Sequence, residues 1–237
     1  MVENIVGTAR TTAGRLNRDV ILEAALSLID ERGLNDLSMR QLGRALGVEA
    51  MSLYRYVNGR EDLLEGVVDL LMRGLTGALA VAEDNHWQQY LQVAAHEVRR
   101  IAVEHPQAFP LVATRHPAAP WLRPPLRSVE VVERFLGAMI GFGFDEEQAV
   151  AAYRSFSSFL LGNLLLESAV RGADTSPEGE PLDEGGADIP QGDAERDLAA
   201  TPHVRRLRGL LSEDRSEDEF EEALESLLDR LDRQLSQ

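Results

Sequence analysis

Two short helical patterns separated by a single glycine restrict the possible folds of this chain more than any other feature of its sequence. The first pattern runs from Ser38 to Leu46, Gly47 ends it, and the second follows Val48 to about Val57. A serine before a helix caps its first amides, and a glycine after it adopts the left-handed conformation that ends helices. Two short helices joined in this way are typical of a helix-turn-helix, whose second helix fits the DNA major groove, which is about 12 Å wide. Small helical bundles that bind no DNA share this spacing, so the spacing alone leaves both interpretations open.

Helical periodicity covers most of the remaining chain, and no segment requires a β-strand. Apolar residues three and four apart predict helices over residues 17–33, 61–79, 87–105, 126–141, 145–170, 202–211 and 217–235. The proline-rich residues 105–125 are predicted to be irregular, and the acidic, glycine- and proline-rich residues 171–197 to form a flexible loop. We therefore predict an all-α chain with a flexible arm at 1–15, a helix-turn-helix domain at 16–62 and a larger helical domain at 63–237.

The charge of the chain is distributed unevenly. The net charge is −16, which argues against binding to phosphate, but residues 1–60 carry 8 Arg against 7 Asp and Glu. The acidic excess therefore lies outside the helix-turn-helix domain. Every basic side chain other than histidine is arginine, whose planar fork suits both phosphate and guanine.

Several functional classes lack the residues that they need. The chain has no cysteine and no Gly-x-Ser-x-Gly motif, and its five histidines are scattered. Two of them, His105 and His116, lie eleven residues apart beside prolines, which is not metal-ligand spacing. We therefore predict no catalytic residues, no metal site and no cofactor, although an enzyme that uses the larger domain stays an alternative. No basic and apolar leader and no apolar run of about 20 residues occur, so a cytoplasmic protein without a membrane partner is expected.

The residues from Ser38 to Val57, SMRQLGRALGVEAMSLYRYV, resemble the signature of the tetracycline-repressor (TetR) family along their whole length. The preceding helix and the segment 58–64 are similar to the family as well, and weaker motifs at 87–91, 113–115, 143–144 and 162–167 extend the resemblance through most of the chain. The resemblance implies a homodimeric repressor that binds a double-stranded DNA operator and is released by a small-molecule inducer, with residues 63–237 as its regulatory and dimerisation domain. Transcriptional activation and a DNA-binding protein that responds to no ligand remain alternatives.

The resemblance also implies a set of DNA contacts. Arg40 matches a position at which the family uses arginine on a guanine, and the apolar side chains of Ala50 and Met51 suit thymine methyl groups. Hydroxyl groups and further arginines suit phosphate oxygens. The predicted DNA-binding residues are Ser38, Arg40, Ala50, Met51, Ser52, Tyr54, Arg55, Tyr56 and Arg60.

The regulatory domain departs from the tetracycline-binding members of the family. The position of their magnesium-binding histidine falls at or near Val112, and three positions of drug contact fall at Ala94, Thr76 and Val98. We therefore predict a small apolar or amphipathic ligand in place of tetracycline and magnesium. Ordinary core packing is the alternative for most of the predicted pocket residues, and simple solvent exposure is the alternative for Arg115. The predicted pocket residues are Val98, Val112, Thr114, Arg115, Trp121, Phe135, Met139, Phe156, Phe159 and Leu160.

The helices predicted over residues 145–170 and 217–235 carry more apolar surface than one core needs. In the family, the corresponding helices pair with those of a second copy. The predicted dimer interface is Phe156, Leu160, Leu164, Leu224, Leu227, Leu228 and Leu231, with packing inside a single chain as the alternative.

Overall fold

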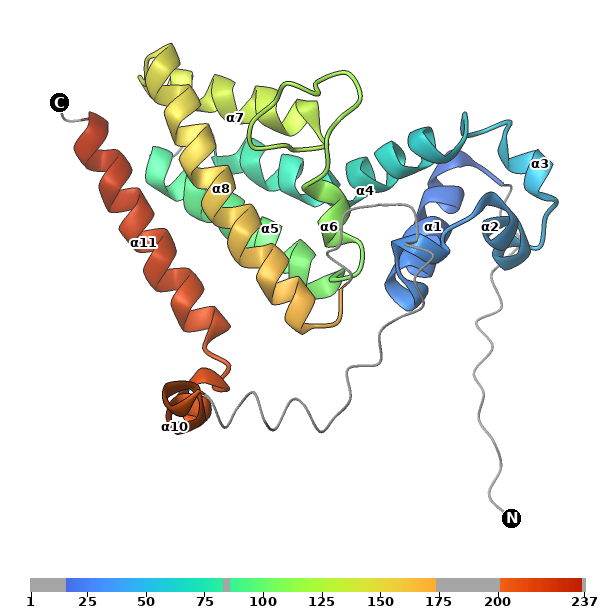
Figure 1. Ribbon diagram of the computed structural model, residues 1–237. Helices are drawn as coiled ribbons and strands as arrows, with labels where there is room; N and C mark the ends of the chain where they lie inside the picture. The colour runs from blue at the N-terminus through green and yellow to red at the C-terminus, as the bar shows by residue number, and fades with distance from the viewer. Residues whose placement is uncertain (1–15, 83–85, 174–200, 236–237) are drawn as a thin grey trace.

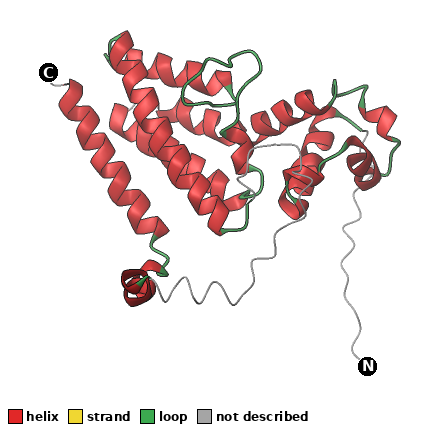
Figure 2. Ribbon diagram, in the orientation of Figure 1, coloured by secondary structure: helices red, strands yellow, loops and turns green. Residues whose placement is uncertain are grey.

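The computed structural model describes residues 16–82, 86–173 and 201–235, and all regular structure in these ranges is helical (Figures 1 and 2). The all-α prediction is thereby confirmed. The predicted arm at residues 1–15 and residues 174–197 of the predicted loop lie outside the described residues. The elements are α1 (Arg18–Arg32), the 3-10 helix η1 (Leu34–Asp36), α2 (Met39–Leu46), α3 (Ala50–Leu53), α4 (Arg60–Ala82), α5 (Trp87–Glu104), α6 (Phe109–Val112), α7 (Val129–Gly141), α8 (Glu146–Val170), α10 (Pro202–Leu211) and α11 (Ser216–Leu235).

Local side-chain capping sets where several helices begin and end. The Asn17 side chain accepts a hydrogen bond from the amide of Val20 at 2.9 Å, and Ser38 Oγ accepts one from the amide of Gln41 at 3.2 Å. Gly47 ends α2 in the left-handed conformation, with φ of 68°. These caps satisfy amides and carbonyls that the helix itself leaves without a partner. They explain why the boundaries predicted near these residues agree with the structure.

Two short elements differ from the sequence-based expectation. Helix α3 ends at Leu53, and residues 54–56 form turns in which the amide of Tyr56 donates to the carbonyl oxygen of Leu53 at 2.9 Å. Helix α6 lies inside the segment 105–125 that was expected to be irregular, and it buries Phe109, Leu111 and Val112. Helices of four residues are too short for an apolar period to be recognised, so their bounds depend on tertiary packing.

Helix α4 joins the head (α1 to α3) to the larger domain, as Figure 1 shows. Its first turns pack on α1 at Gly66, where an added Cβ would lie 2.6 Å from Leu22 Cδ2. A larger residue at this position would therefore require the Leu22 side chain to move. Buried side chains continue along α4 to Leu75, Leu79 and Ala82, which belong to the core of the larger domain. One continuous helix thus runs from the head into the larger domain within a single cluster of buried apolar residues.

The seven side chains predicted for a dimer interface lie inside a single chain. Helix α11 packs its apolar face on α8 and α5, and each of these seven residues is 9% exposed or less. The alternative of intrachain packing therefore describes them, because α11 returns to cover the apolar side of α8. A second copy would have to use other residues of these helices.

Helix α8 is the only helix in the described ranges that is long and apolar enough to span a membrane by length and composition. Its mean hydropathy over 18 residues is 1.2, and 44% of that window is buried within the protein. A central core helix meets the same criterion, and α8 contacts α5, α7 and α11.

Candidate DNA-binding surface and internal cavity

Helices α2 and α3 approach each other at Gly43. A Cβ at this position would lie 2.9 Å from the carbonyl oxygen of Val48 and 3.1 Å from the backbone nitrogen of Ala50. Both atoms belong to the backbone, so the contact cannot be relieved by a side-chain rotation. Gly43 is buried, whereas Ala45, two residues further along α2, is exposed. The two helices of the motif are thus held together by a backbone contact that the apolar pattern did not reveal.

The residues predicted to contact DNA surround α3, and most of them are open to solvent. Met51 is 76% exposed, Tyr54 47% and Tyr56 37%. Arg40 and Arg55 are exposed too, and neither forms an ion pair with any residue that the structure describes. Large apolar and cationic side chains without an intramolecular partner suit a surface that meets a polyanion.

Other members of the predicted set already take part in intramolecular contacts. Ser52 Oγ donates to the carbonyl oxygen of Glu49 at 2.6 Å, and the Ser38 hydroxyl accepts from the Gln41 amide. The Arg60 guanidinium is half-buried and donates to the carbonyl oxygen of Leu34 at 3.3 Å, bracing α4 against η1. Ala50 is partly exposed at the start of α3. These contacts pre-orient the side chains of the surface.

Arg18 organises the head, although sequence analysis assigned it no role. Its guanidinium donates to Asp62 Oδ1 at 2.6 Å and to the carbonyl oxygen of Tyr56 at 2.9 Å. Asp62 also accepts from the amide of Asn58 at 2.6 Å. The hydrogen bond from Arg18 is the main reason why the pKa of Asp62 is lowered from its ordinary value. The cluster ties α1, the end of the recognition segment and the first turn of α4 together.

The lowered pKa of Asp62 predicts a pH dependence of stability. A carboxyl group with a lower pKa in the folded state stabilises the fold above its unfolded pKa of about 3.9, and this contribution is lost as pH falls through the folded value. We expect Asp62→Asn to lower the free energy of unfolding at pH 7 by roughly 1 kcal/mol, because the pair is partly exposed and screened. Urea denaturation at pH 7, 5 and 3.5 measures it. The difference from the wild type should shrink at pH 3.5, and a difference that grows in acid would contradict the assignment.

An internal cavity of about 50 Å³ lies where five helices of the larger domain meet. Five of the ten predicted pocket residues line it: Val98, Val112, Phe135, Phe156 and Leu160. The other nine lining residues were not among the predicted pocket residues, although Ala94 matches a drug-contact position of the tetracycline-binding members: Met72, Leu75, Leu79, Ala94, Leu126, Val131, Tyr153, Ser157 and Leu161. Their apolar spacing predicted burial, but spacing does not distinguish a cavity wall from a filled core.

The other five predicted pocket residues lie elsewhere. Met139 is fully buried in the core, and Phe159 faces α11 with its ring centroid 5.7 Å from that of Phe220. Trp121 is 73% exposed, Arg115 is exposed, and Thr114 donates its hydroxyl to the carbonyl oxygen of Leu111. The pocket prediction therefore included residues of the loop before α7 that do not line the cavity. The sequence of this loop does not indicate which way its aromatic and polar side chains face.

The cavity is lined by apolar side chains and two hydroxyl groups. Tyr153 donates its hydroxyl to the carbonyl oxygen of Pro124 at 3.0 Å, and burial raises the pKa of Tyr153 to about 12. Ser157 lies one turn away on α8, and no charged side chain is among the lining residues. A wall of this composition favours a neutral molecule, because an ion would lose its hydration without gaining a partner.

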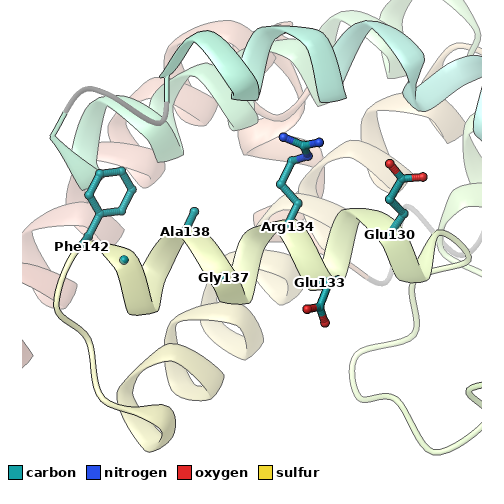
Figure 3. Close-up of a pocket in the computed structure, with 7 residues that line it drawn as sticks. Glu130, Glu133, Arg134, Gly137, Ala138 and Phe142 are labelled. Atoms are coloured by element: carbon teal, nitrogen blue, oxygen red, sulfur yellow. The ribbon is translucent and has the colours of Figure 1, made fainter.

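A larger groove of about 510 Å³ runs along α7 (Figure 3). Figure 3 shows Glu130, Arg134, Ala138 and Phe142 on one side of the helix and Glu133 on the other. The lining residues all belong to α7 and its end, and three of them are charged. Enclosure by several elements distinguishes a ligand cavity from a surface groove, so the smaller apolar cavity is the better candidate.

An ion pair and a hydrogen-bonded histidine–carboxylate contact join the head to the larger domain at two separated places. Arg127, in the loop before α7, lies 2.7 Å from Glu61 of α4, and His105, after α5, lies 2.8 Å from Asp30 of α1. Burial raises the pKa of Asp30 above its ordinary value, and the hydrogen bond to His105 opposes that shift. His105, which was considered as a metal ligand on sequence, thus has a carboxylate partner, and no group of metal-ligating side chains occurs among the described residues.

Comparison with known proteins identifies this arrangement. Residues 21–67 match the family model described as bacterial regulatory proteins, tetR family, and residues 81–235 match the tetracyclin repressor-like C-terminal domain. The chain belongs to the TetR family. It is therefore a helix-turn-helix transcriptional regulator and not an enzyme; members of the family bind DNA operators, act as dimers with small-molecule ligands, and are typically repressors.

Three relatives show how far the similarity extends. The chain is 29% identical over 223 residues to the tetracycline repressor protein class D of Escherichia coli, covering 94% of this chain and 92% of that protein. It is 30% identical over 159 residues to an HTH-type transcriptional regulator of Saccharopolyspora erythraea, which covers 67% of this chain but 64% of the relative. The crystal structure of a possible TetR family regulator from Streptomyces coelicolor A3(2) superposes with a TM-score of 0.67 at 28% identity, covering 92% of this chain and 99% of that one.

Proposed function

We propose that this TetR-family chain is a cytoplasmic, homodimeric repressor that leaves a palindromic operator when a neutral apolar or amphipathic molecule enters its cavity. The course of α4 carries the proposal. The first turn of α4 is tied to the head through Asp62, and Met72, Leu75 and Leu79 further along line the cavity. A ligand that spreads the cavity wall therefore acts on the helix that holds the DNA-binding surface.

In the proposed DNA complex, Arg40 donates two hydrogen bonds to a guanine, and Ala50 and Met51 contact thymine methyl groups. The remaining predicted side chains position the head on the DNA backbone. The exposure of Arg40, Met51 and Tyr54 supports these roles. The hydroxyl-bearing and cationic residues that contact phosphates are Ser38, Ser52, Tyr54, Tyr56, Arg55 and Arg60.

The proposed dimer places two recognition segments roughly 34–36 Å apart, which is one turn of DNA. Exposed apolar side chains on α8 support it, since Leu166 is 72% exposed and Val170 88%. A palindromic operator requires a protein with matching two-fold symmetry. These residues replace the seven buried leucine and phenylalanine side chains as the proposed contacts with a second copy.

The proposed ligand is neither tetracycline nor its magnesium complex. Val112, Ala94 and Val98 line the cavity and present no metal ligand and no polar contact. A cavity of about 50 Å³ is also smaller than the 300–1,000 Å³ of typical ligand sites, so binding requires the wall to open. Opening that disfavours the DNA-binding geometry by about 1–3 kcal/mol would weaken operator binding 5- to 150-fold.

A mobility-shift assay on palindromic DNA upstream of the chain's own gene tests DNA binding. We expect two chains per palindrome, and we expect Arg40→Ala combined with Tyr54→Phe to weaken binding about 100-fold or more, because a guanine contact and a phosphate contact are lost in each copy. Arg73→Ala is the control, since it removes an exposed arginine of α4 outside the proposed surface. Absence of wild-type binding, or equal binding by the double variant, would refute the proposal.

The same assay separates an inducible repressor from a protein that binds DNA without responding to ligands. An apolar extract of the cell's metabolites should release the wild type, and tetracycline with magnesium should not. Operator binding that no extract changes would favour the ligand-independent alternative.

A further inference from the structure

Arg127 is a buried arginine that neither faces the predicted DNA surface nor lines the cavity. It is 6% exposed and immediately precedes Ser128, the N-cap of α7. Burying a guanidinium is costly unless its hydrogen bonds and its charge are compensated. Its partners therefore indicate what the residue holds in place.

One set of contacts attaches Arg127 to α6. Its backbone amide donates to the carbonyl oxygen of Val112 at 3.0 Å, and its Nη1 donates to Thr114 Oγ1 at 3.1 Å. Thr114 in turn donates to the carbonyl oxygen of Leu111 at 2.7 Å. Val112 and Leu126, the residue before Arg127, are both part of the cavity wall. A movement of this part of the cavity wall therefore moves Arg127 as well.

A separate contact attaches Arg127 to the head. Its Nη2 donates to Glu61 Oε2 at 2.7 Å, in the first turn of α4. The next residue, Asp62, binds Arg18, which also donates to the carbonyl oxygen of Tyr56. Adjacent carboxylates of α4 thus hold the larger domain on one side and the recognition segment on the other.

We propose that Arg127 is a positioning residue that transmits the state of the cavity to the DNA-binding head through Glu61. The biological role of this coupling rests on the proposed function. The contacts that carry it lie within one chain, so they can be tested without DNA. When the cavity opens, the wall at Val112 and Leu126 moves away from α4. Arg127 moves with it, and the head either turns with Glu61 or loses this attachment. Either result changes the orientation of the head relative to the larger domain, and the His105–Asp30 pair keeps the head attached.

The absence of cysteine from the sequence allows the movement to be measured directly. Cysteines introduced at the exposed positions Ala45 of α2 and Glu133 of α7 carry spin labels, and double electron–electron resonance gives the distance between head and larger domain. Labelled chains are diluted with unlabelled wild type, so that only the distance within one chain contributes. The substitution Ala94→Leu fills the cavity and serves as the probe in place of a ligand; Ala94→Val is the milder version.

We expect Ala94→Leu to shift the label distance by about 1–2 Å, the size of typical helix movements in switching proteins. Glu61→Gln should abolish this response, since Glu61 is exposed and its replacement removes only the ion pair. Arg127→Gln should do the same, and the double variant should add nothing to either single change. Glu65→Gln is the matched control, because it lies one turn along α4 and makes no ion pair with the described residues.

An equal response to Ala94→Leu with and without Glu61 would overturn the inference, and so would no response in either background. The spectroscopic result is independent of DNA. A chain that shows the Glu61-dependent shift but binds no operator would retain the coupling while refuting the proposed function. Operator binding without the shift would refute the coupling alone.

Discussion

Replacing Gly43 with alanine should weaken operator binding more than tenfold while the larger domain stays folded. The new Cβ would lie 2.9 Å from the Val48 carbonyl oxygen and within 3.2 Å of two backbone atoms of Ala50. Because only backbone atoms are involved, α3 has to move away from α2. Such overpacking typically costs about 1–3 kcal/mol, and the displaced recognition segment no longer matches the groove. We expect the affinity for the operator to fall more than tenfold in a mobility-shift assay, with little change in the helical circular dichroism signal.

Gly77→Ala is the matched control for this prediction. Gly77 lies exposed on α4, and an added Cβ meets no atom within 4 Å. Alanine at an open helical position should leave operator binding unchanged and raise stability by about 0.5–1 kcal/mol. Operator binding by Gly43→Ala that equals binding by Gly77→Ala would show that the close contact between α2 and α3 does not control the surface.

Replacing Phe156 with alanine should cause the largest loss of stability from a single change in the cavity wall. Phe156 is 3% exposed, and its ring stacks on Phe135 with a centroid distance of 5.6 Å. Truncation removes this contact and enlarges an existing void, for which we expect a cost of about 3–5 kcal/mol and a fall in Tm of roughly 6–20 °C. Benzene at saturation should recover part of the Tm, because a ligand that binds only the folded state stabilises it.

Phe159→Ala on the same helix separates the cavity from general packing. Phe159 is half-buried, faces Phe220 and does not line the cavity, so the loss should be smaller and benzene should recover none of it. Phe156→Leu provides a milder change if the alanine variant does not fold. Equal recovery of the variants of Phe156 and Phe159 by benzene would contradict an enclosed apolar cavity at Phe156.

Local interactions explain how much of the fold could be predicted. Asn17, Ser38 and Gly47 act on amides and carbonyls within a few residues of themselves, so their effect is visible in the sequence. Apolar spacing predicted α4, α5 and α8 for the same reason, since a helix repeats after 3.6 residues whatever it packs against. The signature from Ser38 to Val57 then identified the family, and the family models confirmed it.

The residues that line the cavity could be predicted only in part from the sequence. Val98 and Phe156 line it as expected, but Trp121 points into solvent and Tyr153 faces the cavity without having been assigned to it. An aromatic side chain has the same chemical character whether it lines a cavity, packs against another helix or faces solvent, so its identity does not tell these places apart. Only the path of the chain between helices determines which ring reaches the cavity.

The sequence by itself determined the helical class, most helix boundaries and the kind of DNA-binding motif, because these depend on neighbours within one or two helical turns. The tertiary structure alone decided that Gly43 sets the distance between α2 and α3, that α11 uses its apolar face inside one chain, and that Arg127 meets Glu61. The last contact joins residues 66 positions apart. A charge pair at that separation leaves no periodic or capping signal, and it forms because folding brings the loop before α7 against the first turn of α4.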